Sequence, residues 1–263
     1  MRKLPIHLPS DPSFKHYRDK CICCEESGKL MNKEHIFPLW LLERTNNCDI
    51  LLNSPYGKIP GSKYTIPLCK ECNSELGKKL ESNVSRVFDD LETGKGATDH
   101  EVELLIRWLW KMQGMFYWAI CNSHWKYGVV KLKERVLTPI SGTRSRISIG
   151  IALIEDPYEG SNYTPVGLDT FPFWSTVLAA GVFSRMAVVV LYTHLVKHLN
   201  QDIWSIYTLS DNPLLINPSK RFFPRTTIET SSKAILLTKF MLVKTVYFMK
   251  SRKTLRLICD LHL

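Results

Sequence analysis

The sequence lacks the long hydrophobic runs, the repeats and the low-complexity segments that mark membrane, fibrous and disordered proteins. Its most apolar stretch, residues 170–196, is interrupted by Arg185, and the uncharged part on either side is too short to cross a bilayer. Glycine and proline number only 13 and 14 of 263 residues, which excludes a collagen-like chain. Residues 1–14 contain no continuous apolar segment of the kind that a secretory signal needs. We therefore expect a cytosolic globular protein with no membrane partner.

Acidic residues are scarce in one segment only, and there they leave a large excess of positive charge. The net charge of the chain is +10, and residues 220–256 hold ten Lys/Arg against one Asp/Glu. The rest is nearly balanced: residues 1–92 hold 14 basic against 13 acidic residues, and residues 93–219 hold 11 against 10. Such an excess is typical of a surface that contacts a polyanion, although a solvated basic face explains the charge alone equally well. The candidate nucleic-acid-binding residues of this segment are Lys220, Arg221, Arg225, Lys250, Arg252 and Lys253.

The cysteines include two C-x2-C pairs, Cys21/Cys24 and Cys69/Cys72, which 44 residues separate. Two such pairs can supply four thiolates to one tetrahedral zinc ion, and a fully thiolate-bound zinc has no open position for water. The pattern therefore predicts a structural zinc site. Two alternatives stay open: Cys23 replaces one member of the first pair, or the cysteines are unlinked buried thiols.

Further polar and aromatic residues accompany the cysteine pairs in a fixed order. They are Glu34-His35-Ile36-Phe37-Pro38-Leu39-Trp40-Leu41 after the first pair, Asn73 directly after the second, then Leu80-Glu81, and finally Arg107-Trp108-Leu109-Trp110-Lys111. Over residues 18–115 this order resembles the HNH endonucleases of the ββα-metal superfamily, in particular a bacterial group with an E-H-x-x-P-x-W motif and paired C-x2-C knuckles. The resemblance implies a zinc-clamped ββα-metal nuclease module, in a phage-defence or mobile-element setting.

Three side chains become candidates for phosphodiester hydrolysis. A histidine can take a proton from water near neutral pH, so His35 is the candidate general base. Asn73 offers a hard oxygen ligand for Mg²⁺ or Mn²⁺, and the resemblance implies that Glu34 reaches the same ion. Glu81 lies about 80° from Asn73 around a regular helix and is a further candidate contact. The alternatives are a surface or core Glu-His pair, a helix-capping Asn73 and an exposed Glu81.

The sequence departs from the family pattern at one position. The middle asparagine of the HNH motif, about five residues before the second knuckle, is replaced here by Tyr64. In the family that asparagine bonds the loop that holds the histidine. Here the alternatives for this supporting role are Asn46, Asn47 and Asn53, which lie in the preceding loop.

The remaining chain predicts an α+β fold in two domains. Apolar spacing predicts helices over residues 74–91 and 100–121, the second with aromatic residues that we expect to pack in a core, and alternation predicts a strand over residues 146–153. We expect a buried helix over residues 176–199 and either two strands or a helix and a strand over residues 234–257. The turn at residues 93–96 divides an HNH module with structural zinc (1–93) from a mixed α/β domain (94–263), which binds nucleic acid or is regulatory.

Together these features predict a metal-dependent endonuclease that cleaves DNA, with RNA left open as a substrate. One alternative is a non-catalytic zinc-knuckle DNA-binding protein. Another is a nuclease that stays silent until a ligand, an activating partner protein or a second copy of the chain releases it.

Overall fold

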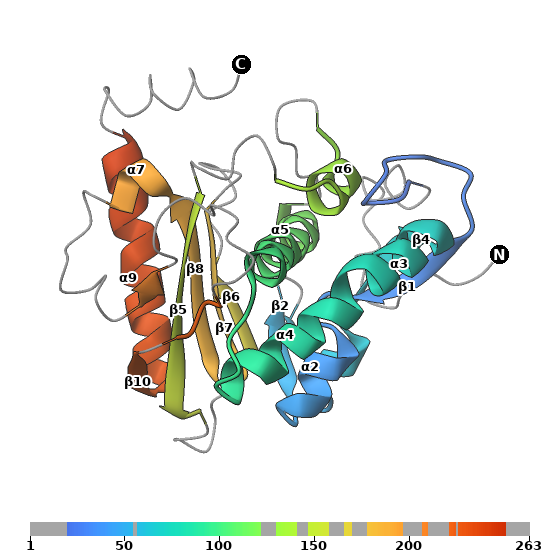
Figure 1. Cartoon of the computed structure of the whole chain (residues 1–263). Coiled ribbons are helices and arrows are strands. Elements are labelled where there is room, and N and C mark those ends of the chain that lie inside the picture. Colours follow the sequence, from blue (N-terminus) through green and yellow to red (C-terminus); the bar gives the residue numbers. More distant parts are fainter. Residues whose placement is uncertain are drawn as a thin grey trace. The chain divides into compact units, whose positions relative to one another are not determined.

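The computed structural model describes residues 20–54, 57–121, 130–140, 147–157, 166–169, 178–196, 207–209, 221–224 and 226–250. The chain divides into two compact units, one formed by residues 1–87 and 107–139 and the other by residues 88–106 and 140–263. Both units combine helices with strands, so the predicted α+β class is confirmed at that level. Figure 1 shows the helices and strands of both units.

The first unit is organised around a two-stranded antiparallel sheet. Strand β1 (Met31–His35) pairs with β4 (Thr65–Cys69), which places Met31 opposite Cys69 and His35 opposite Thr65. The segment between these strands contains α2 (Leu39–Arg44), the antiparallel pair β2 (Leu51–Ser54) and β3 (Gly57–Pro60), and the 3-10 turn η2 (Gly61–Lys63).

A continuous helical run follows β4. It consists of α3 (Lys70–Leu76), the π-helical turn η3 (Gly77–Glu81) and α4 (Ser82–Glu92), so the helix predicted over residues 74–91 is confirmed. Its apolar side is buried through Leu76, Leu80, Val84 and Val87. The π turn was not predicted, because the apolar spacing does not distinguish one wide turn from a regular helix.

The aromatic helix α5 (Asp99–Cys121) matches the helix predicted over residues 100–121. Trp108 and Trp110 have no exposed surface and Trp118 has 1%, so these rings form core, as expected. The Trp40 ring packs against Trp108 with a centroid separation of 5.9 Å. Aromatic rings buried in this way stabilise the unit by removing a large apolar area from water.

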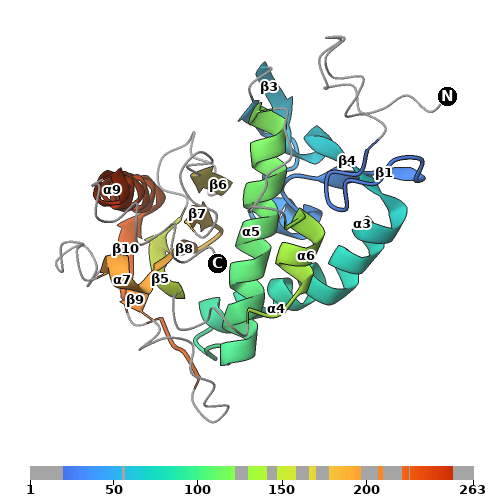
Figure 2. The ribbon, with the colours of Figure 1, turned by 90° about the horizontal axis from the view of Figure 1, so that it is seen from above.

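Helix α6 (Leu132–Leu137) lies beside α5 (Figure 2). The two helices approach closely at Gly114, where an added Cβ would lie 2.5 Å from Cδ1 of Leu132. The guanidinium carbon of Arg135 lies 3.5 Å from the centre of the Trp110 ring. Gly114 therefore costs helix propensity but permits this packing.

The second unit contains a six-stranded sheet with the order β10-β5-β8-β7-β6, in which β9 also pairs with β5. Its elements are β5 (Ile147–Asp156), β6 (Val166–Asp169), β7 (Ala179–Phe183), β8 (Met186–Tyr192), α7 (Thr193–Val196), β9 (Thr208–Leu209), β10 (Thr227–Thr230) and α9 (Ser231–Lys250). The pair β10–β5 is parallel and the others are antiparallel. Helix α9 packs against the sheet, as Figure 1 shows.

One prediction for this unit needs correction, and another is tested only in part. The buried helix predicted over residues 176–199 is wrong, because the described part of this range forms the β7–β8 hairpin and the short α7. Both strands are buried along their whole length, so their residues form a continuous apolar run without the alternation that marks a strand. In the range 234–257, residues up to Lys250 belong to the single helix α9, and the rest lie outside the described residues. No described helix is long and apolar enough to span a membrane.

Candidate functional site

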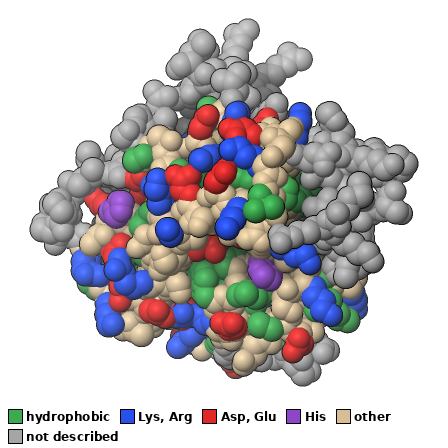
Figure 3. All heavy atoms as spheres, turned by 90° about the vertical axis from the view of Figure 1, so that its right-hand side faces the viewer, with side chains coloured by type: hydrophobic (Ala, Val, Ile, Leu, Met, Phe, Trp, Pro, Cys, Tyr) green, Lys and Arg blue, Asp and Glu red, His purple; other side chains and the backbone are tan. Residues whose placement is uncertain are grey.

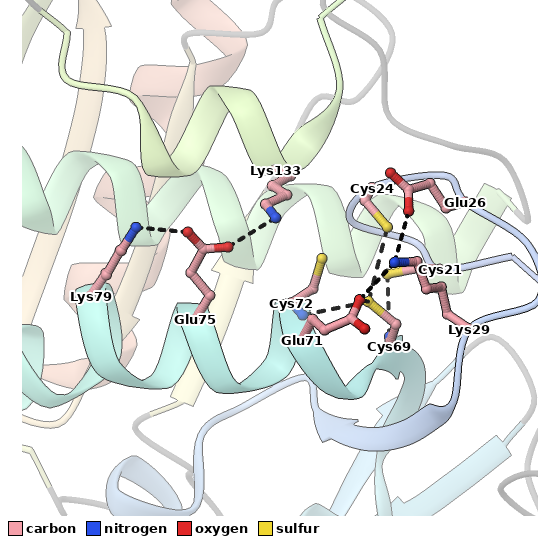
Figure 4. A network of polar contacts seen from close by, with 10 residues as sticks. All are labelled: Cys21, Cys24, Glu26, Lys29, Cys69, Glu71, Cys72, Glu75, Lys79 and Lys133. Carbon is pink, nitrogen blue, oxygen red and sulfur yellow. Dashed lines mark hydrogen bonds and ion pairs between the residues drawn. The ribbon is translucent and has the colours of Figure 1, made fainter.

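The four cysteines predicted to bind zinc converge in the first unit. Cys21, Cys24, Cys69 and Cys72 are all buried, and their sulfur atoms lie within 4.8 Å of one another. The Sγ atoms of Cys24 and Cys69 are 3.9 Å apart, close to the edge of about 3.8 Å that a tetrahedron with Zn–S bonds of about 2.3 Å requires. Figure 4 shows the thiols turned toward a common centre. The donor set and its geometry therefore fit a structural zinc ion, whereas Cys23 is buried but is not part of the cluster.

The first knuckle is a tight backbone turn. The amide of Glu25 donates to the carbonyl of Cys21 at 2.8 Å, and the amide of Cys21 donates to Glu26 O at 3.0 Å. Glu25 has a φ of 62°, and Lys20 and Ser27 close the turn as an antiparallel bridge. The turn aims the two thiols of this pair at the same point.

The second knuckle lies where β4 becomes α3. Cys69 is the N-cap of the helix, and its Sγ accepts a hydrogen bond from the amide of Cys72 at 3.4 Å. The amide of Cys69 in turn donates to Sγ of Cys21 at 3.3 Å. Amide donors and a helix N-terminus both favour the thiolate form of cysteine, which is the form that binds zinc.

The thiols are costly to ionise without a cation among them. Burial raises the pKa of the Cys24 thiol to about 11. A divalent cation at the centre of the cluster would offset this cost. The chemistry of the site thus agrees with its geometry.

Charged side chains join the two knuckles at the surface. Nζ of Lys29 lies 3.3 Å from a carboxylate oxygen of Glu26 in the first knuckle and 3.0 Å from one of Glu71 in the second (Figure 4). A hydrogen bond with Glu75 raises the pKa of Lys133 to about 12, and the amide of Lys133 donates to the carbonyl of Cys23 at 2.9 Å. Helix α6 is therefore tied to the first knuckle as well.

His35, the predicted general base, ends β1 and is half-buried. Its Nε2 lies 3.0 Å from the carbonyl oxygen of Ser62 in η2. A carbonyl only accepts hydrogen bonds, so Nε2 carries the proton in neutral imidazole, and Nδ1 keeps the lone pair. The backbone thereby selects one tautomer and one ring orientation.

Ser62 is itself held by the loop that precedes it. Its amide donates to Cys48 O at 2.9 Å. Asn47, next to Cys48, has no exposed surface, and its side-chain amide donates to Oγ1 of Thr45 at 2.8 Å. Of the three asparagines considered for the supporting role, Asn47 is the buried one; Asn46 is exposed, and the Asn53 side chain lies outside the described residues.

Tyr64, which stands where the HNH pattern has its middle asparagine, is also buried. Its carbonyl accepts from the amide of Ile36 at 3.0 Å, directly after His35. Backbone groups of Ser62 and Tyr64 thus hold the two successive residues His35 and Ile36. Sequence reasoning missed Ser62, since a backbone carbonyl leaves no side-chain pattern.

Glu34 and Glu81 are brought together by a third residue, Lys111 of α5. The ammonium of Lys111 has no exposed surface and forms ion pairs with Oε1 of Glu34 and with Oε1 of Glu81. Burial alone would lower the pKa of Lys111, but the two carboxylates outweigh it and raise that pKa. Burial raises the pKa of Glu34, and the nearby ammonium offsets part of this effect.

Asn73 lies in the first turn of α3, against β1. Its side-chain amide donates to the carbonyl of Lys33 at 3.3 Å, which leaves Oδ1 as an acceptor beside the residue that precedes Glu34. The alternative that Asn73 caps the helix is wrong, because Cys69 is the N-cap. Within the described residues, only the four cysteines form a group of three or more His, Cys, Asp or Glu side chains placed to share a metal ion.

The predicted nucleic-acid-binding residues fall mostly outside the described residues. The predicted residues outside the described part of the chain are Lys220, Arg225, Arg252 and Lys253, and the side chain of Lys250 is also not described. Arg221 is described in the second unit, where its Nη2 donates to Gly96 O at 2.9 Å. On the face drawn in Figure 3, basic and acidic side chains of the described residues are intermixed.

Comparison of the chain with protein-family models, with curated proteins and with solved structures gives no match in any of the three. The zinc-binding geometry therefore stands on the cysteine cluster alone, and the function has to be inferred from the chemistry of the residues.

Proposed function

We propose that the chain is a zinc-clamped HNH-type endonuclease that hydrolyses DNA phosphodiester bonds with the help of a divalent ion. One observation carries the proposal: His35 ends the first strand of a strand–strand–helix arrangement clamped by four cysteines, and a backbone carbonyl fixes its tautomer. A structural zinc site alone needs neither an oriented imidazole nor a carboxylate beside it.

In this mechanism His35 is the general base. Its Nδ1 accepts the proton of the attacking water, which makes the water a stronger nucleophile toward phosphorus. The imidazolium that forms keeps its Nε2–H bond to the Ser62 carbonyl, and this bond strengthens because the donor is now charged. Because this bond already orients the ring, proton transfer requires no reorientation of the imidazole.

The residues next to His35 fit a hard divalent ion such as Mg²⁺ or Mn²⁺. The ion pair with Lys111 engages Oε1 of Glu34 and leaves Oε2 for another partner. Asn73 offers Oδ1, and its amide contact with Lys33 keeps it near the same strand. Carboxylate and amide oxygens are suitable ligands for these ions. When bound there, the ion would neutralise the charge that develops on the scissile phosphate.

The test is plasmid cleavage by the zinc-loaded wild type and by the His35→Ala variant, with and without added Mg²⁺ or Mn²⁺. We expect ion-dependent nicking or linearisation by the wild type and a loss of at least about a hundredfold in the variant. His100→Ala is the matched control, since His100 is an exposed histidine outside the site. A chelator is used to remove the added ion, and zinc content is measured in every sample. The effect of the chelator on the structural zinc is thereby separated from its effect on the added ion.

Equal cleavage by the wild type and His35→Ala would contradict the proposal. Failure of a folded, zinc-loaded wild type to cut any DNA under these conditions would contradict constitutive cleavage.

A further inference from the structure

Among the described residues of the first unit, Lys111 is the charged residue with the least exposed side chain. Lysine is almost never fully buried unless it is paired. Here the pairing is double: Glu34 from β1 and Glu81 from η3 both contact the ammonium, and they are only 13% and 16% exposed. Three charged groups from three elements thus meet at one point.

The surroundings of Lys111 hold it in place. Trp108, one turn earlier in α5, and Met112, the next residue, have no exposed surface. Glu81 ends the π turn, and an extra residue in one turn rotates the following positions relative to a regular helix. This turn therefore sets the direction from which Glu81 approaches the ammonium.

The charges of the three groups sum to −1, and the ammonium lies where a divalent ion would otherwise bridge two carboxylates. Two neighbouring buried carboxylates without a cation would attract such an ion strongly. With Lys111 present, Oε1 of each carboxylate is engaged. Oε2 of Glu34 is not part of this ion pair, and Asn73 contacts the same strand through the carbonyl of Lys33.

We propose that Lys111 is a positioning residue: it occupies the space between Glu34 and Glu81, fixes Glu34 through Oε1 and so directs the divalent ion to Oε2. This inference rests on the proposed function and assigns roles to Lys111 and Glu81. Glu81 anchors the ammonium and is not a ligand of the ion.

Two variants separate positioning from charge. Lys111→Met changes the net charge of the group from −1 to −2, and the double variant Lys111→Met/Glu81→Gln restores it to −1. We expect the single variant to bind Mn²⁺ more tightly yet cleave more slowly at saturating Mn²⁺, because the ion enters between the two carboxylates. We expect the double variant to bind Mn²⁺ about 10–100-fold more weakly than the wild type, because Glu34 is no longer held.

Mn²⁺ affinity is measured by titration calorimetry on zinc-loaded protein, and cleavage rates are measured in parallel. Lys79→Met is the matched control, since Lys79 forms a surface ion pair with Glu75 and should leave both values unchanged. A structural role alone would not shift the ion affinity in opposite directions in two folded variants. If a lysine variant does not fold, Glu81→Gln alone serves, and it should weaken Mn²⁺ binding as well.

Equal Mn²⁺ affinity in the wild type and in the folded variants would overturn the inference while leaving the nuclease intact. Cleavage by a wild type that binds no Mn²⁺ would also overturn it. Loss of cleavage in His35→Ala with unchanged Mn²⁺ affinity would support the nuclease independently of Lys111.

Discussion

Removal of zinc should release the first knuckle from the rest of its unit. The knuckle consists of Lys20 to Ser27, eight residues whose aliphatic contribution to the core is Ile22. Ordering eight residues costs about 8–16 kcal/mol of backbone entropy. Burial of Ile22 returns about 2 kcal/mol. Zinc bound to a site of this kind contributes about 10–16 kcal/mol, which is similar to the remaining cost.

Hydrogen exchange on the reduced protein, with zinc and after chelation, measures this release amide by amide. The amides of Cys21, Glu25 and Lys133 form hydrogen bonds within or to the knuckle, so we expect them to lose protection when zinc is removed. Amides in the middle of α5 are the internal control, because the hydrogen bonds of this helix do not depend on the knuckle. Unchanged protection in protein shown by elemental analysis to be zinc-free would refute the reasoning.

Substitution of single cysteines tests the same site without a chelator. Cys72→Ser should bring the zinc content well below one ion per chain, because one of the four converging sulfurs is lost. Cys23→Ser removes a neighbouring buried thiol that is not part of the cluster, and it should keep one zinc per chain. A loss of zinc in Cys23→Ser would show that Cys23 replaces Cys21 or Cys24 as a ligand.

Three stability measurements probe the packing around the site and the second unit. Lys111→Ala should destabilise the protein by about 3–5 kcal/mol in urea unfolding, because two largely buried carboxylates lose their buried cation. Lys79→Ala at the surface should cost less than about 1 kcal/mol. Gly114→Val should cost at least about 2 kcal/mol, because its side chain overlaps the buried Leu132. Burial raises the pKa of Tyr207 to about 12. The unfolded chain, with a tyrosine pKa of about 10, therefore releases this proton first, and the free energy of unfolding falls by about 3 kcal/mol as the pH rises from about 10 to about 12. Tyr207→Phe should abolish this loss.

Much of the fold was predictable from local patterns. The C-x2-C pairs predict the four-cysteine cluster because the turn between two such cysteines is short and aims both sulfurs the same way. The helix predicted over residues 100–121 is α5, and the strand predicted over 146–153 lies within β5. Both elements are almost entirely buried, but their sequences still show a period: polar residues recur every four residues in α5 at Glu103, Arg107 and Lys111, and isoleucine alternates with small residues in β5.

Local patterns failed where burial is complete and the sequence shows no period. Residues 179–183 and 186–192 form two strands that are buried on both faces, and apolar runs of this kind are equally compatible with a helix. The β-branched residues Val188, Val189 and Val190 favour a strand, and Ser184-Arg185 provides the turn between the strands. These signals were present in the sequence but are weaker than the apolar run that suggested a helix.

In the candidate site, sequence patterns failed for a different reason: some of its groups are far apart in the sequence or belong to the backbone. Glu34, His35 and Asn73 carry recognisable side chains, but the Ser62 carbonyl that orients His35 has no residue-type signature. Lys111 did leave a signal, because a lysine among the apolar residues of a core helix requires acidic partners, and it lies 77 residues from Glu34 in the sequence. A search for carboxylates able to neutralise a buried lysine would therefore have included Glu34 and Glu81 among the candidate partners. Buried charges in core-forming helices are thus useful long-range constraints, since the cost of leaving them unpaired restricts which distant residues can be their neighbours.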